Sequence, residues 1–166
     1  MFDVCVPLTT GIVQKQAADE IVGYNAYTGQ YGLVLTPAQA AELVETRTLA
    51  LQETGRLEFG SGVIGRLIKA FSDSPFLFMH NYVQTLHELI DIFYYYKNET
   101  LDLISDNDLI DFMREAFNGR CQGSLDLLAG RELDRLAHSL RFGLPAPACD
   151  DADDGGDDKY EEYEEE

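Results

Sequence analysis

The stretch from Ser74 to Asn98 constrains the fold most, because it joins a helix start to a long apolar stripe. Ser74 suits an N-cap, and Pro75 suits the first helical position, where no N–H is needed. The apolar residues that follow recur at helical spacing: Met79, Tyr82, Val83, Leu86, Leu89, Ile90 and Phe93. We therefore predict a central helix of roughly 36 Å over residues 74–98.

Helix signals also recur through the rest of the chain. Thr36 and Gln39 form a capping box around Pro37, and Gly55 is a natural end for that helix. Further helices are predicted over residues 10–24, 64–71, 105–118, 124–129 and 131–142, whereas strand patterns are confined to short pieces near 2–6, 33–35 and 56–59. We expect residues 1–143 to form one all-α or nearly all-α helical bundle around the central helix.

The negative charge is concentrated at the C-terminus. The whole chain carries a net charge of −18, but residues 150–166 hold eleven acidic residues and one Lys, a net of −10. Such a segment buries too little apolar surface to offset the entropy of ordering it. Residues 144–166 are therefore predicted to be a disordered acidic tail, whose role is solvation, attraction of a basic partner or affinity for cations.

Deleting residues 146–166 is expected to leave the thermal unfolding midpoint nearly unchanged, because the deleted segment lacks apolar periodicity. Thermal melts followed by circular dichroism test this. A marked drop in the midpoint would mean that the tail docks on the helical body.

The composition excludes several classes of protein. The acidic balance disfavours nucleic acids and anionic membrane surfaces, which attract clustered Lys and Arg. Cys5, Cys121 and Cys149 lack metal-ligand spacing, and no cofactor motif is complete. The N-terminus does not resemble a signal peptide, and no apolar run approaches membrane-spanning length. We expect a cytoplasmic protein.

Gly60–Gly65 matches the pattern G-x-G-x-x-G at the start of a predicted helix. Backbone N–H groups at Gly60, Ser61 and Gly62 are candidates for binding an anion. A dinucleotide site would also need a strand on each side of this helix, and the sequence predicts another helix instead. The alternative interpretation is a flexible turn before a closely packed helix.

Two helical pairs carry possible metal ligands. His87 and Asp91 lie one turn apart with Glu88 beside them, and Asp134 and His138 repeat this spacing. If the two helices were adjacent, the pairs could form a hydrolase centre. The competing interpretation, which we favour, is that these are solvated polar faces without a metal.

Tyr94-Tyr95-Tyr96 cannot place all three rings on one apolar stripe, since neighbouring helical residues point about 100° apart. Tyr95 is predicted to lie on the polar side, where exposed tyrosines are common in interfaces. We name Tyr94, Tyr95, Glu88 and Gln84 as candidate partner-binding residues. The alternative is that another helix covers this side.

Several segments resemble an uncharacterised bacterial family known only as a domain of unknown function. They are Leu35-Thr36-Pro37 with Leu43-Val44-Glu45, Gly55–Gly60, Phe93–Glu99 and Gly123-Ser124-Leu125. The resemblance covers most of residues 10–142 and leaves out the acidic tail. It implies a bacterial, cytoplasmic helical protein and supplies no catalytic residues.

Two functional classes follow from these observations. The first is a non-enzymatic interaction module that binds a protein partner or a second copy of itself. The second is a ligand-binding protein or metal-dependent enzyme that uses the Gly60 helix start or the His87 face. An exposed apolar patch favours the first class, and a pocket with convergent polar groups favours the second.

Overall fold

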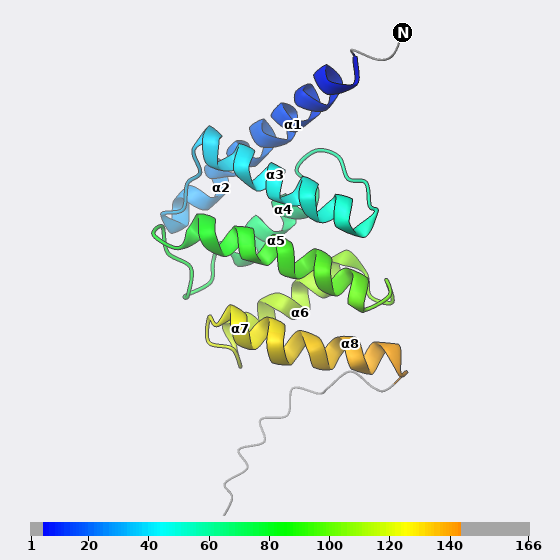
Figure 1. The fold of residues 1–166 in the computed structure, drawn as a ribbon. Coiled ribbons are helices and arrows are strands. Elements are labelled where there is room, and N and C mark those ends of the chain that lie inside the picture. Colours follow the sequence, from blue (N-terminus) through cyan, green and yellow to red (C-terminus); the bar gives the residue numbers. More distant parts are fainter. Residues whose placement is uncertain (1–4, 144–166) are drawn as a thin grey trace, which may run out of the picture.

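The computed structural model describes residues 5–143, and every regular element in that range is a helix (Figure 1). The predicted all-α fold is therefore confirmed, whereas the predicted tail lies outside the described residues. The elements are α1 (Cys5–Gly23), α2 (Asn25–Thr28), the 3₁₀ turn η1 (Gly29–Tyr31), α3 (Pro37–Thr54), α4 (Gly62–Phe71), α5 (Tyr82–Glu99), α6 (Asp106–Asn118), α7 (Leu125–Leu127), the π-helical segment η2 (Leu128–Leu133) and α8 (Asp134–Arg141).

Helix α5 is the central helix of the bundle, as predicted. Figure 1 shows α1, α3, α5 and α8 following one another down the molecule, with α4 and α6 behind them. Helices α3, α4, α6 and α8 all pack against α5. The predicted stripe of α5 is fully buried at Leu86, Leu89, Ile90 and Phe93, so this helix supplies the middle of the core.

The predicted start of the central helix is wrong by seven residues, because the N-cap is Asn81 instead of Ser74. Helix α5 begins at Tyr82, and Ser74 is a buried turn residue whose hydroxyl donates to the side-chain oxygen of Asn118. Asn81 closes the preceding turn, since its Oδ1 accepts from the Phe78 N–H (2.7 Å) and its Nδ2 donates to the Phe76 carbonyl (3.1 Å). These side-chain hydrogen bonds satisfy the backbone groups of Phe76 and Phe78 in a turn, so the helix does not need to begin there. The 18 residues of α5 span roughly 27 Å.

The capping box at Thr36 is confirmed. The Thr36 hydroxyl accepts from the Gln39 N–H (3.1 Å), the Gln39 side chain accepts from the Thr36 N–H (2.9 Å), and Gly55 ends the helix with φ of 66°. Residues 33–35 form no regular element, and the Asn25 side chain hydrogen-bonds both the N–H and the carbonyl of Leu35 (2.8 Å each).

The two predicted C-terminal helices are one continuous helical segment. The Ser124 hydroxyl accepts from the Leu127 N–H, which confirms the predicted start. Gly130 does not break the helix, because the π-helical turn η2 joins α7 to α8 without a gap. At the other end of the chain, α1 begins at Cys5 instead of an extended arm, and Pro7 falls in its first turn, where proline is tolerated.

Alkaline pH is expected to destabilise the fold through buried Tyr82. Burial raises the pKa of Tyr82 from 10.0 to about 12, so above pH 10 the unfolded chain loses a proton that the folded chain keeps. Stability is unaffected below pH 10 and then falls by up to about 1.4 kcal/mol per pH unit. Urea titrations between pH 8 and 11 measure this slope. Tyr82→Phe should make the slope shallower, and an unchanged slope would contradict the assignment.

Candidate functional site

A hollow of about 410 Å³ lies between α3 and α5, and we call it the acidic hollow. The two helices run side by side in the same direction, since Thr46 on α3 contacts His87 near the start of α5, whereas Glu53 and Asp91 interact further along both helices. The hollow is lined by Ala50, Glu53, Thr54, Asp91, Tyr94, Tyr95 and Asn98.

The charges of the acidic hollow are unbalanced. Partial burial raises the pKa of Asp91 above its usual value, and the nearby carboxylate of Glu53 raises it further. No Lys or Arg is among the residues that line the hollow. A cationic group placed there would therefore relieve the repulsion between the two carboxylates.

The structure separates the candidate partner-binding residues. Tyr95 is 57% exposed at the acidic hollow, and Gln84 is exposed and donates to the Glu88 carboxylate (2.9 Å). Tyr94, however, is only 3% exposed, and its hydroxyl donates to Glu58. Little of Tyr94 is therefore available to a partner, because the α3–α4 loop covers the edge of α5 from which Tyr94 projects.

Glu53, which lines the acidic hollow, and Leu49 beside it on α3 were not predicted as functional residues. Leu49 lies one turn after Thr46 and one turn before Glu53 on α3, so it is a neighbour of the acidic hollow without lining it. Its side chain is exposed. The signal in the sequence was a leucine that falls outside the apolar stripe of this helix.

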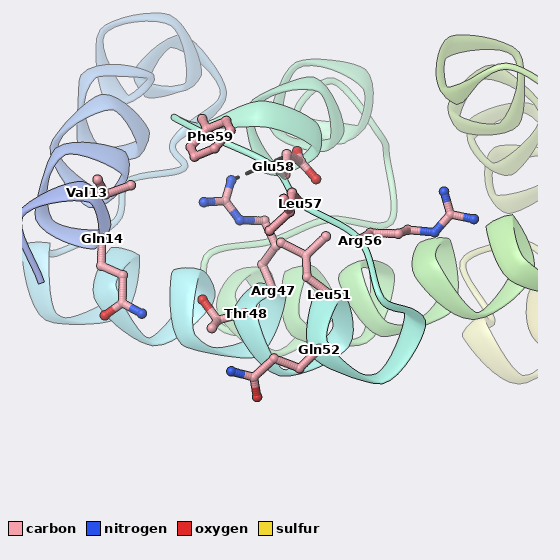
Figure 2. A pocket seen from close by; sticks show the side chains of 10 residues that line it. All are labelled: Val13, Gln14, Arg47, Thr48, Leu51, Gln52, Arg56, Leu57, Glu58 and Phe59. Atoms are coloured by element: carbon pink, nitrogen blue, oxygen red, sulfur yellow. Dashed lines mark ion pairs between the residues drawn. The ribbon is translucent and has the colours of Figure 1, made fainter. Parts of the chain in front are cut away.

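A second hollow of about 360 Å³ lies between α1, α3 and the α3–α4 loop, and we call it the apolar pocket (Figure 2). Its lining residues are Val13, Gln14, Arg47, Thr48, Leu51, Gln52, Arg56, Leu57, Glu58 and Phe59. Leu57 is 89% exposed and Phe59 is 74% exposed at its edge. Figure 2 shows the Arg47 side chain rising from α3 toward Phe59, whereas Arg56 points away from the pocket.

Glu58 ties the α3–α4 loop to the body of the protein. Its carboxylate accepts from the Tyr94 hydroxyl and from the Val63 N–H at the start of α4. The Arg47 guanidinium lies 4.0 Å from the same carboxylate and donates to the Gly60 carbonyl (2.6 Å). Burial and the Glu58 carboxylate both raise the pKa of Tyr94, so its hydroxyl stays protonated and keeps donating.

The predicted anion-binding residues Gly60, Ser61 and Gly62 do lie at a helix start, but carboxylates of the protein occupy it. The Ser61 N–H donates to Glu20 (2.7 Å), and the Val63 N–H donates to Glu58. Gly60 and Gly62 adopt positive φ, and a Cβ on either would meet one of these two carboxylates. An external anion would have to displace both, so this geometry does not favour an anion site.

The two candidate metal pairs do not converge. His87 faces α3, with its Nδ1 2.7 Å from the Thr46 hydroxyl, whereas the Asp134 carboxylate accepts from the Tyr96 hydroxyl (2.6 Å). The His138 ring packs on Phe142 instead of approaching His87. Within residues 5–143, no group of three or more His, Cys, Asp or Glu residues could hold a metal ion.

The protein purified without a tag is expected to contain no stoichiometric zinc, iron or manganese, because a stable site normally needs three or four preorganised ligands. Elemental analysis of the intact chain tests this. About one metal ion per chain, lost in His87→Ala, would contradict it and revive the hydrolase hypothesis.

The described residues define a small all-helical protein with two distinct surface hollows, one acidic and one apolar. None of the helices within residues 5–143 has the length and apolar character needed to cross a membrane. Residues 20–146 match the model of a family of unknown function, DUF6323, and the chain belongs to this family. No curated protein and no solved structure matches the chain.

Proposed function

We propose that this protein is a non-enzymatic cytoplasmic interaction module whose acidic α3–α5 face receives a basic segment of a partner protein. The observation that carries the proposal is the exposed ring of Tyr95 at the edge of a hollow that contains two carboxylates and no cation. Tyrosines bring large contact area to interfaces at a small entropic cost.

The charge of this face selects the kind of partner. Glu53 and Asp91 repel each other, and Glu88 lies one turn before Asp91 on the same helix. Two copies of such a face would repel, which disfavours self-association through it and also disfavours nucleic acid. A Lys or Arg side chain flanked by an apolar residue would instead pair with the carboxylates and pack on Tyr95 and Leu49.

Capture of partners from the source cell tests the proposal. The intact protein is compared with Tyr95→Ala and with the double variant Glu53→Gln, Asp91→Asn, which keeps the shape of the hollow and removes its charge. Both variants should lose the same co-purifying protein while their denaturant unfolding stays close to that of the parent. Binding of that protein should also weaken as salt is raised, because exposed charges are screened.

Tyr31→Ala serves as the matched control, because Tyr31 is another exposed tyrosine and does not line the acidic hollow. It should retain the partner. If Tyr95→Ala and the double variant retain every partner that the parent protein captures, the proposal is wrong. If the parent protein self-associates and Tyr95→Ala does not, the partner is a second copy of the chain and not a basic segment of another protein.

A further inference from the structure

We propose that the apolar pocket is a binding site for an aliphatic carboxylate, with the guanidinium of Arg47 as its anchor. The pocket lies on the other side of α3 from Thr46 and does not share Tyr95 with the acidic hollow. The inference is therefore independent of the proposed interaction face.

The size and the walls of the pocket suit an apolar chain. Its volume of about 360 Å³ falls within the range of roughly 300–1,000 Å³ that is typical of small-molecule sites. Val13, Leu51, Leu57 and Phe59 supply most of the wall, from α1, α3 and the α3–α4 loop (Figure 2). A bound aliphatic chain would cover Leu57 and Phe59, two apolar side chains that are otherwise left to water.

Arg47 is the polar group to which a ligand would bind. The residue is 3% exposed, and a guanidinium carries five N–H donors. Nη1 donates to the Gly60 carbonyl, whereas the buried Nε has no hydrogen-bond partner within the described part of the chain. In Figure 2 the other terminal nitrogen points toward Val13, into the pocket. A buried cation with so few bonds is costly unless a further acceptor reaches it.

Glu58 does not supply that acceptor. Its carboxylate already accepts from Val63 and Tyr94, and its nearest oxygen is 4.0 Å from Arg47, beyond hydrogen-bond distance. The negative charge of Glu58 nevertheless lies close by, which favours a singly charged ligand over a phosphate. A carboxylate matches the planar fork of a guanidinium and carries one charge.

Isothermal titration of the full chain with octanoate at pH 7.5 tests the proposal, with octanamide as the uncharged isostere. Octanoate should bind at one site, and octanamide should bind at least about tenfold more weakly, a difference of about 1.4 kcal/mol. Equal binding of the two compounds, or no octanoate binding at millimolar concentration, would overturn the proposal.

Two variants locate the site. Arg47→Gln should lose the preference for octanoate over octanamide while it still binds octanamide. Because Arg47 also holds the loop, a second variant, Val13→Trp, fills the pocket from α1 and should abolish octanoate binding. Ile12→Trp is its control, since the exposed Ile12 is adjacent in sequence but does not line the pocket. Octanoate binding that survives Val13→Trp would place the ligand elsewhere and overturn the assignment.

Discussion

Phe93→Ala is expected to lower the free energy of unfolding by about 3–5 kcal/mol, the cost of removing a buried aromatic side chain. Phe93 is fully buried on α5, and its ring packs edge-on against Tyr94 with centroids 5.1 Å apart. Tyr95→Ala, two positions further along the same helix, should change the free energy by no more than about 0.5 kcal/mol, because Tyr95 is exposed. Urea titration of both variants measures the difference.

The comparison also checks the exposure of Tyr95. The Tyr95 ring contacts Tyr96 edge-on with centroids 4.9 Å apart, and Tyr96 itself is buried. If Tyr95→Ala destabilises the protein as severely as Phe93→Ala, Tyr95 is part of the core and the acidic face loses its aromatic contact. The main support for an interaction module would then be gone.

Glu58→Ala is expected to destabilise the protein by about 2–4 kcal/mol, the range for leaving two largely buried hydrogen-bond donors without an acceptor. The substitution leaves Arg47 without its nearby countercharge and removes the acceptor of both the Tyr94 hydroxyl and the Val63 N–H. Denaturant unfolding at neutral pH measures the loss. We also expect the α3–α4 loop to become more accessible to proteolysis, because Glu58 is one of the residues that tie it to the body of the protein.

Glu58→Gln separates the charge of Glu58 from its hydrogen bonds. The amide oxygen can still accept from Val63 or Tyr94, so this variant should be destabilised less than Glu58→Ala. Glu45→Ala removes a carboxylate from an exposed position of α3 and should have little effect. A loss below about 1 kcal/mol in Glu58→Ala would show that solvent, instead of Glu58, stabilises Arg47.

The parts of the fold that depend on local chemistry could be predicted from the sequence. The capping box at Thr36 and the left-handed Gly55 each require only residues within a few positions of one another, and both form as expected. The start of α5 could not be predicted in this way. Ser74-Pro75 is a good local helix start, but Ser74 bonds instead to Asn118, 44 residues away.

The candidate site was predicted only in part, for a related reason. A single apolar stripe describes a helix with one covered face, whereas α5 is covered by helices on several sides and by the α3–α4 loop at Tyr94. The periodicity therefore identified exposed Tyr95 but not buried Tyr94. Arg47 could not be identified either, because arginines are seldom buried and nothing nearby in the sequence marks this one as an exception.

The central place of α5 also limits how the protein can come apart. Helices α3, α4, α6 and α8 all pack against α5, and the buried apolar residues form one cluster. Neither the N-terminal nor the C-terminal half of the bundle therefore has a separate hydrophobic core. A fluctuation that detaches α5 would expose the inner faces of both halves at once. Local opening is thus confined to the rim of the molecule, and the centre opens only when the whole bundle does.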